Sequence, residues 1–596
     1  MGSIVGILVR EGQVDPGRIQ AMLRAAPHRG QHVEHAGSGL VRFGISFRED
    51  LRTAWLAENE GWIAAVAGMI DNLPELASQL GMQSGIGRNH QPAEVVLGAF
   101  RTWGEKAANL VRGAWACLVS DGTRLWAIRD QVGFKSVFYG ADASASVFAS
   151  EAKQVAAGLG IDRKANLEAV EEIFYHGLSS ESAIRGVKRL DAASIAVTRP
   201  EGHSSIRRYW DPSDLVESSR LQVDEAIERL VELADQAVRR SVRGHDAVLL
   251  SGGIDSTTVA AFAAPIHQRL AGRPLLGLTL VYPQYSSVDE RSYTEEVAEY
   301  LGIPLHAYEP TQRFLGDLDR WVDLFDGPWD TLPASLVVES FEHAVNRGAR
   351  VLLSGDLAEA VYAMPQYILS HLALHGRWRA LRNRLQALHQ NGSGWYGLMK
   401  RLVKEAAPPR ALIWNARRKD IMRYQTPDWV DAQATGRRYE RLDLDIPARR
   451  RWLHNQAHPA LAVNSTWEAN EICAVSQGVE ERRPLVDVDL WEFFISLRAE
   501  VKYPAPLSKS LVRQAMRGRL PDRVLDRREK TAFDEYVLAI AEYDVIEKWV
   551  LGSDYRVAGV DYGRLKDRLN ERNMGTRELS WAQDLAKVHA FVDRFS

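Results

Sequence analysis

The chain has 596 residues, of which 46% are hydrophobic and 25% are charged. This length predicts two or three domains, and the composition excludes long disorder, a collagen-like fibre and a bundle of membrane helices. The 74 Lys and Arg against 77 Asp and Glu give a formal charge of −3, so global charge does not indicate nucleic-acid binding.

The cysteines and the N-terminus favour a cytoplasmic protein. Two cysteines, Cys117 and Cys473, cannot form a disulfide framework or a structural zinc site alone. Residues 1–10 contain too short an apolar run, and no basic lead-in, for a signal peptide. We therefore expect a reducing compartment.

The first 210 residues predict an α+β domain with antiparallel sheets. Short β-like runs alternate with turns, and helical patterns are few. The expected strands are Ile4–Val9, Trp62–Val66, Trp115–Val119, Leu125–Ile128, Ser146–Ala149 and Ser194–Val197, and the expected helices are Pro92–Trp103 and Leu167–Tyr175.

From about residue 211 the pattern changes to apolar strands that are each followed by a helix. A helix over Val223–Val242 precedes three such pairs, which lie at 247–264, 275–301 and 351–362. This alternation predicts an α/β domain with a parallel sheet covered on both faces, whose ligands bind at the carboxyl ends of the strands. Residues 366–464 are expected to be helical and basic.

A candidate phosphate loop, Ser251-Gly252-Gly253-Ile254-Asp255-Ser256, lies between a buried strand and a helix. Two glycines let backbone N–H groups approach an anion, while Asp255 would repel phosphate unless Mg²⁺ lies between them. Taken alone, Gly-Gly could be an ordinary strand–helix corner. A second corner, Ser354-Gly355-Asp356-Leu357-Ala358-Glu359, makes a metal–pyrophosphate site the better interpretation.

The motifs together resemble the asparagine synthetase superfamily over nearly the whole chain. The two corners are similar to its S-G-G-x-D-S loop and its S-G-[DE]-G-x-D-E corner. Further similarities are Pro27–Gly30 to H-R-G, Arg129–Lys135 to R-D-x-x-G-x-K, Phe148–Lys153 to F-A-S-E-x-K, Arg208–Asp211 to the linker, Glu480–Asp487 to E-x-R-x-P-F-L-D and Lys509–Arg513 to K-x-x-L-R. The resemblance implies an Ntn glutaminase-like αββα sandwich at 1–210 and a PP-loop ATP pyrophosphatase-type synthetase domain at 211–596.

The departures from these motifs predict that the first domain does not hydrolyse glutamine. That reaction needs a cysteine at position 2 as the N-terminal nucleophile, and this chain has Gly2. The family's N-G-E segment is Ala67-Gly68-Met69, and Pro92 stands where the S-D-T-E segment has Asp. A cloning scar could explain Gly2 alone, but not all of these changes.

The resemblance also implies roles for residues of the second domain. ATP is expected to contact the first loop, Leu280 and the start of the second corner, in the set Leu250, Ser251, Gly252, Gly253, Asp255, Ser256, Leu280, Ser354 and Gly355. Asp255 and Glu359 are the expected ligands of Mg²⁺, although Glu359 replaces the family's Asp.

Three residues are candidates for catalysis. Asp356 could take a proton from the attacking amine, with Glu471 as its partner, and Lys530 could stabilise charge on the adenylate and pyrophosphate oxygens. Glu468 and Glu480 are rivals of Glu471. Each carboxylate could instead be an ordinary ion-pair residue, and a lone Lys is usually solvated.

Residues 377–451 contain 18 Lys and Arg against seven Asp and Glu, with four interleaved Trp and a fifth, Trp452, directly after them. A flexible peptide substrate must lose chain entropy before its ends meet, so an enclosing basic surface could shape it. A snorkelling helical surface or a subunit contact would explain the same composition.

The favoured interpretation is a lasso peptide cyclase. By resemblance, ATP and Mg²⁺ would activate an Asp or Glu side chain of a leader-free precursor peptide, and the peptide's N-terminal amine would close a macrolactam. The expected partners are that precursor peptide, its leader-removing protease and a leader-binding protein, with no nucleic acid or membrane. The alternatives are a β-lactam synthetase-like enzyme, an ammonia-using asparagine synthetase and a catalytically dead scaffold.

Overall fold

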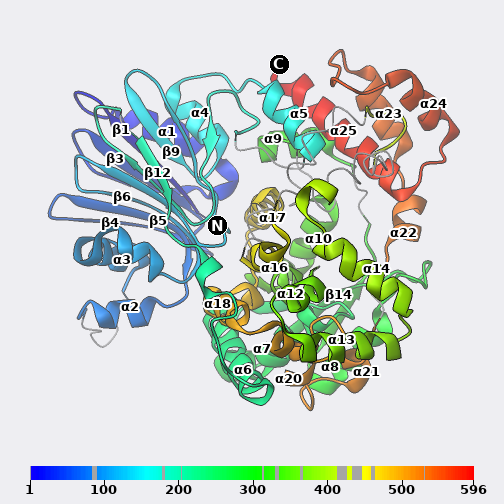
Figure 1. Ribbon diagram of the computed structural model, residues 1–596. Coiled ribbons are helices and arrows are strands. Elements are labelled where there is room, and N and C mark those ends of the chain that lie inside the picture. The colour runs from blue at the N-terminus through cyan, green and yellow to red at the C-terminus, as the bar shows by residue number, and fades with distance from the viewer. Residues whose placement is uncertain are drawn as a thin grey trace.

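The computed structural model describes most of the chain and shows two domains side by side (Figure 1). The described residues are 2–82, 90–176, 181–202, 204–311, 315–328, 334–362, 367–412, 426–431, 446–457, 464–528 and 531–596. The first domain contains two β-sheets that face each other, and the second contains a parallel sheet surrounded by helices.

Two six-stranded sheets form the first domain. The first has the order β10-β8-β9-β1-β3-β2, and the second β12-β11-β7-β6-β5-β4. Their strands are β1 Ser3–Val9, β2 His32–Ala36, β3 Val41–Phe47, β4 Ala54–Asn59, β5 Trp62–Ile70, β6 Gly113–Ser120, β7 Leu125–Arg129, β8 Phe138–Ala141, β9 Ala145–Ala149, β10 Lys188–Arg189, β11 Ser194–Thr198 and β12 Ser204–Arg208. All of these strand pairs are antiparallel, as the sequence predicts.

Side-chain alternation gives each sheet two apolar faces. Ile4 and Leu8 of β1 pack between the sheets, while Val5 and Ile7 point to helices α1 (Pro16–Arg24) and α4 (Ala152–Leu159). Helices α2 (Leu73–Gln79) and α3 (Pro92–Trp103) lie by the second sheet, over the core that contains Val66 and Cys117. The αββα arrangement is therefore confirmed.

The second domain contains a five-stranded parallel sheet in the order β15-β14-β13-β16-β17. Its strands are β13 Asp246–Leu249, β14 Leu276–Leu280, β15 Leu305–Tyr308, β16 Val351–Leu353 and β17 Glu480–Arg482. All four strand pairs are parallel, so the loops that follow the strands meet at one edge. The α/β expectation is confirmed.

Helices cover both faces of this sheet. Val248 of β13 belongs to the same core as α6 (Val223–Ser241) and α7 (Ile254–Ala271), whereas Ala247 belongs to the core of α10 (Ala334–Val345) and α17 (Asn464–Gln477). Neighbouring residues of one strand thus face opposite layers, and residues 247–249 are all apolar for this reason.

The remaining helices lie around this layered core. They are α5 Leu167–His176, α8 Arg291–Leu301, α9 Leu318–Phe325, α11 Ala358–Tyr362, α18 Val488–Ser496, α19 Ala499–Lys502, α20 Ser510–Ala515, α21 Asp522–Leu525, α22 Asp534–Ala539, α23 Tyr543–Gly552, α24 Tyr562–Glu571 and α25 Thr576–Phe595. Within the described residues, no helix has the length and apolarity needed to cross a bilayer. Cys117 and Cys473 are both buried free thiols.

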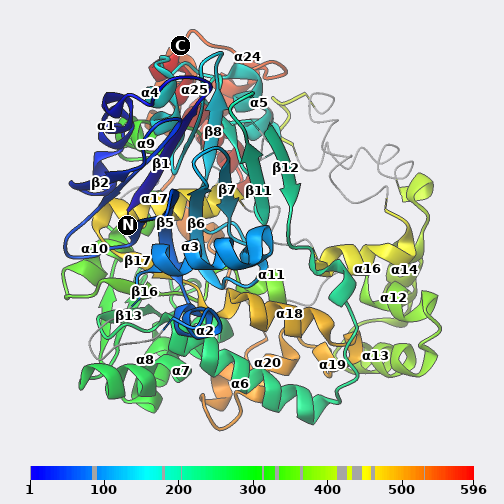
Figure 2. The same cartoon turned by 90° about the vertical axis from the view of Figure 1, so that its left-hand side faces the viewer.

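Four helices form a separate lobe of the second domain. They are α12 Ile368–Leu374, α13 Trp378–Gln390, α14 Trp395–Ala406 and α16 Ala448–Ala457. Figure 2 shows them gathered at one side of the molecule, away from the sandwich. The helical character expected for residues 366–464 is confirmed for these segments, while residues 413–425 and 432–445 lie outside the described part.

Candidate active site

The candidate phosphate loop connects β13 to the start of α7. The Ser251 backbone N–H donates to Ser256 Oγ at 3.0 Å, and the two serine hydroxyls lie 2.9 Å apart. These contacts fold the loop back over the N-terminus of an 18-residue helix, where backbone N–H groups and the helix dipole favour an anion. The loop has the geometry expected of a phosphate site.

The second corner lies directly against this loop. A Cβ atom on Gly355 would lie 2.3 Å from the Ser256 backbone nitrogen and 2.7 Å from the Asp255 carbonyl carbon. Only glycine allows the two strand-end loops to approach so closely. Ser354 and Gly355 therefore lie beside the phosphate loop, as the sequence predicts for an ATP site at this edge.

Leu357 departs from the family motif at a position where backbone conformation matters. Its φ is +66°, in the left-handed region, and it stands where the S-G-[DE]-G-x-D-E pattern has glycine. A non-glycine residue in this region costs roughly 1–2 kcal/mol. The side chain packs partly buried against the core of α6 and α7, which offsets this cost.

Asp255 and Glu359 stand on the two loops from which they are expected to hold Mg²⁺. Asp255 forms an ion pair with Lys509, whereas Glu359 is exposed. Among the described residues, no three His, Cys, Asp or Glu side chains are grouped to hold a metal. Mg²⁺ is commonly held by one or two carboxylates with waters and substrate phosphates, so these two oxygen donors fit a metal that arrives with ATP.

Glu290 is a residue of this loop that the sequence analysis does not identify. Its carboxylate accepts the Gly252 backbone N–H at 2.9 Å, pairs with Arg527 at 2.8 Å and accepts a hydrogen bond from Thr531 at 2.6 Å. Arg527 in turn donates to the Gly252 carbonyl at 2.9 Å. Glu290 and Arg527 together hold the glycine turn, and no local motif reveals them.

Asp356 is exposed at the start of the second corner, next to a buried pair of charges. Its backbone N–H donates to Ser354 Oγ at 3.0 Å. The neighbouring strand β17 places Glu481 in an ion pair with Arg483. Burial raises the pKa of Glu481 to about 7, the Asp356 carboxylate adds to the rise, and Arg483 opposes it. A carboxylate in this setting can exchange a proton near neutral pH.

Glu471, the predicted partner of Asp356, binds side chains of the first domain. Arg29 Nη1 donates to Glu471 Oε1 at 3.1 Å, Lys135 Nζ lies 3.5 Å from the same oxygen, and Ser136 Oγ donates to Oε2 at 3.4 Å. Burial alone would raise the pKa of Glu471, but Lys135 and Arg29 hold it below its ordinary value. Glu471 is therefore held as an anion at the domain junction.

The two rivals of Glu471 are also paired. Glu468 accepts from Arg129 at 3.0 Å and from Arg189 at 3.1 Å, both in the first domain. Glu480 is buried and lies 3.4 Å from Arg482. The sequence analysis does not consider Glu481, whose pKa is raised in part by the charge of Asp356. The carboxylate of Glu359 in turn raises the pKa of Asp356. Lys530 lies outside the described residues and stays a prediction.

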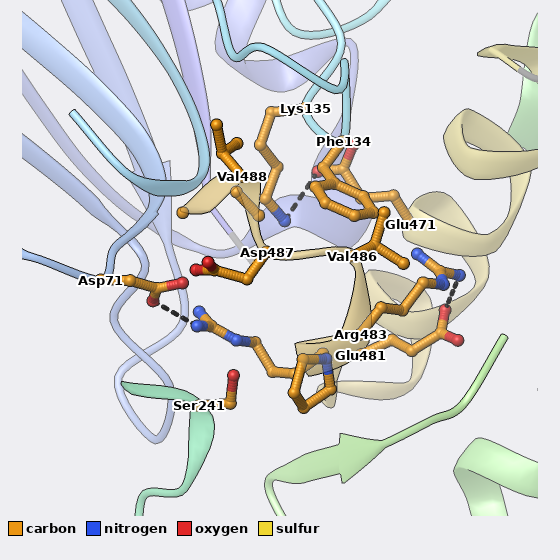
Figure 3. A pocket seen from close by; sticks show the side chains of 14 residues that line it. Asp71, Phe134, Lys135, Ser241, Glu471, Glu481, Arg483, Val486, Asp487 and Val488 are labelled. Carbon is orange, nitrogen blue, oxygen red and sulfur yellow. Dashed lines mark hydrogen bonds and ion pairs between the residues drawn. The ribbon is translucent and has the colours of Figure 1, made fainter. Parts of the chain in front are cut away.

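A small cavity lies between the two domains next to Glu481 (Figure 3). Its volume is about 40 Å³, and its walls include Lys135 and Phe134 from the first domain and Glu481 and Arg483 from the second. A cavity of this size holds only a few water molecules. It offers no room for a substrate between the domains.

The position of a glutaminase nucleophile is closed in this structure. Gly2 is buried, and its N–H donates to Thr53 Oγ1 at 2.7 Å. A Cβ atom at this position would lie 2.3 Å from the Ser46 carbonyl oxygen and 2.4 Å from Ala54 Cβ. A cysteine side chain would not fit here unless the strands moved.

A larger groove lies in the second domain, between α13 and α19. Its volume is about 580 Å³, and Trp378, Arg379, Asn383, Tyr503 and Pro504 are among its lining residues. Trp378 is 66% exposed. Two of the cations of this basic region are already bound, since Arg377 pairs with Glu217 at 2.6 Å and Arg384 donates to the Tyr503 carbonyl at 2.8 Å.

Comparison with known proteins settles the family. The asparagine synthase family model matches residues 229–587, and a glutamine amidotransferase domain model matches residues 1–210. The chain belongs to the asparagine synthase family. Its members form carbon–nitrogen bonds, and the family uses ATP with Mg²⁺, which agrees with the two contacting loops at the sheet edge.

Two relatives are each 25% identical to this asparagine synthase family member over the aligned residues. "Asparagine synthetase [glutamine-hydrolyzing] 3" of Bacillus subtilis is 25% identical over 505 residues, covering 80% of this chain and 76% of that protein. "Amidase chyE" of Penicillium rubens is 25% identical over 292 residues, covering 45% and 42%. A solved Bacillus subtilis glutamine phosphoribosylpyrophosphate amidotransferase has 15% identity and a TM-score of 0.26 over 60% of this chain and 91% of that one.

Proposed function

We propose that this protein is an AMP-forming ligase that closes a macrolactam in a leader-free precursor peptide, as in lasso peptide biosynthesis. A carboxylate oxygen of an Asp or Glu side chain attacks the α-phosphate of ATP, and pyrophosphate leaves. The peptide's N-terminal amine then attacks the acyl carbon, the bond to the AMP oxygen breaks, and an isopeptide bond forms with loss of one proton.

The chain's own residues supply the parts for these steps. The phosphate loop offers backbone N–H groups to the polyphosphate, and Asp255 and Glu359 would hold the Mg²⁺ that neutralises it. Asp356 is exposed at the same edge, where it can take the proton of the incoming ammonium group. Lys530 remains the proposed cation for charge on the adenylate.

The observation that carries the proposal is the closed position of Gly2. Without a cysteine there, and with no space for its Cβ, the first domain cannot form a thioester with glutamine. The nitrogen must then come from another source. An amine tethered to the activated carboxylate needs no ammonia, and the cavity between the domains is small and lined by charged side chains.

The groove in the helical lobe supports the proposal that the substrate is large. The 580 Å³ groove beside α13 is lined by apolar and aromatic residues together with several charged side chains, which suits a peptide segment. An enclosing surface would lower the entropic cost of bringing the two ends of a peptide together. The precursor peptide, its leader-removing protease and a leader-binding protein are the proposed partners.

A β-lactam synthetase-like reaction on a small substrate is the second candidate. It shares the closed glutaminase position but needs no peptide groove, and Asp356 stands where those enzymes have Tyr. An ammonia-using asparagine synthetase would also lack the nucleophile, but it would require free ammonia in the reaction.

Pyrophosphate release separates these candidates. With ATP and Mg²⁺, we expect release to depend on a linear peptide with a free N-terminal amine, and neither aspartate with ammonia nor a small β-amino acid to replace it. Asp255→Ala should abolish release, whereas Asp224→Ala, an exposed residue at the start of α6, should leave it unchanged. Full product formation by the Asp255 variant would disprove its proposed metal role.

A further inference from the structure

Helix α17 carries two carboxylates toward the first domain. Glu468 and Glu471 are three residues apart, so they lie on one face of the helix. The side chain of Glu471 is 6% exposed and that of Glu468 is 12% exposed. Buried carboxylates of this kind persist only where cations compensate them.

The first domain supplies four cations to these two carboxylates. Arg29 and Lys135 pair with Glu471 at 3.1 and 3.5 Å. Arg129 and Arg189 pair with Glu468 at 3.0 and 3.1 Å. Arg29 and Arg129 are almost completely buried, so these pairs are shielded from water and salt. Figure 3 shows Lys135 reaching Glu471 across the junction.

Helix α17 leads directly into β17, the strand that lies beside the second corner. Strand β17 follows α17 after two residues and pairs with β16. The Ser354 backbone N–H donates to the Arg482 carbonyl at 2.9 Å, immediately before Gly355 and Asp356. Arg482 in turn forms an ion pair with Asp71 of the first domain. Both α17 and β17 are thus fixed by charges from the sandwich.

We propose that the glutaminase-like domain acts as an electrostatic clamp that positions α17 and β17, and through them the Asp356 corner. Glu468 and Glu471 are then positioning residues that act at the domain junction. The clamp gives this domain a role that requires no nucleophile. The activity part of its test rests on the proposed ligase function, whereas the structural part does not.

Amide hydrogen exchange in the full-length protein tests the clamp directly. Glu471→Gln should increase amide exchange across residues 464–483 by about tenfold, because the buried cations Arg29 and Lys135 lose their anionic partner. Arg29→Met should have a similar effect, and the double variant should be no worse than the more affected single variant. Glu232→Gln removes an exposed ion pair with Arg229 within α6, at 2.7 Å, and should change nothing.

A milder variant and a charge exchange keep the test decisive if Glu471→Gln fails to fold. Lys135→Met removes the longer of the two ion pairs to Glu471. The exchanged pair Lys135→Glu with Glu471→Lys should recover part of the protection. Additive effects of Arg29 and Glu471, or unchanged exchange at 464–483 in a folded variant, would overturn the clamp.

Steady-state kinetics test the positioning role where the wild-type protein turns over a peptide. Glu471→Gln should lower kcat about tenfold while the Kd for MgATP changes less than about twofold, because the phosphate loop is held by other residues. Loss of MgATP affinity equal to the loss of kcat would contradict positioning. If the wild-type protein forms no AMP with any peptide, the proposed function fails, and the exchange measurements still decide on the clamp.

Discussion

Gly355 lies against the backbone nitrogen of Ser256, so close that a Cβ atom there would be 2.3 Å away. This contact joins the acidic corner to the phosphate loop. It fixes the distance between the residues expected to bind ATP and Asp356, the residue expected to take a proton from the attacking amine. Gly355 has no side chain, and the atoms that it meets in Asp255 and Ser256 belong to the backbone. Neither loop can therefore relieve the contact by a side-chain rotation.

Gly355→Ala should therefore separate the two loops. We expect a loss of about 1–3 kcal/mol in the free energy of unfolding and loss of ATP-dependent turnover. Gly253→Ala is the matched control for stability, since its φ is −89° and its Cβ would lie 3.3 Å from a movable hydroxyl, Ser251 Oγ. Equal unfolding free energies for the two variants in urea would show that the loops are not in tight contact.

Glu290→Gln should weaken MgATP binding. The variant loses a charged acceptor of the Gly252 N–H and the ion pair with Arg527, so the glycine turn is held less firmly. A charged hydrogen bond of this kind contributes about 1.5–3 kcal/mol, which predicts an increase in Kd of at least about tenfold by calorimetry. Glu296→Gln breaks an exposed pair with Arg523 and should leave the Kd unchanged.

Gly2→Cys should not create a glutaminase. The new Cβ would overlap the Ser46 carbonyl oxygen and Ala54 Cβ, so the expected result is a lower Tm and no glutamate released from glutamine. The measurement is glutamate production with the new cysteine at the N-terminus after removal of Met1. Glutamine hydrolysis by this variant would mean that the strands yield, and that the active-site geometry is still present.

Glu481 should make stability depend on pH. Its pKa is raised from 4.5 to about 7, so the folded protein binds a proton that the unfolded chain releases. Its contribution to stability is therefore complete below pH 4.5 and is lost as the pH rises through 7. In Glu481→Gln, the free energy of unfolding should decline less between about pH 5 and 8, by on the order of 1–3 kcal/mol. Parallel pH profiles for both proteins would contradict this assignment.

Local sequence patterns predict the strands and helices that are determined by their own residues. The runs at 247–264 and 351–362 predict strand, loop and helix because a buried strand, two small residues and a helical repeat follow one another, and the structure contains β13 with α7 and β16 with α11 at these places. Strand β3, by contrast, contains Gly44 and Arg42 and gives no clear alternation. Its place is set by pairing with β1, not by its own residues.

The environment of Glu471 cannot be predicted in the same way. Arg29 is 442 residues away in the chain, and nothing near either residue indicates that they meet. The motifs single out Glu468 and Glu471 as candidates but do not indicate which way their side chains point. Glu290 and Glu481 escape sequence analysis for the same reason, because their partners come from other elements of the fold.

The identity of the products tests the central claim most directly. The full-length protein is incubated with ATP, Mg²⁺, nitrogen-labelled glutamine and linear peptides that carry a free N-terminal amine and an internal Asp or Glu. The account predicts AMP and pyrophosphate, together with a peptide that has lost one water and contains no labelled nitrogen. ADP among the products, or label in the peptide, would contradict it.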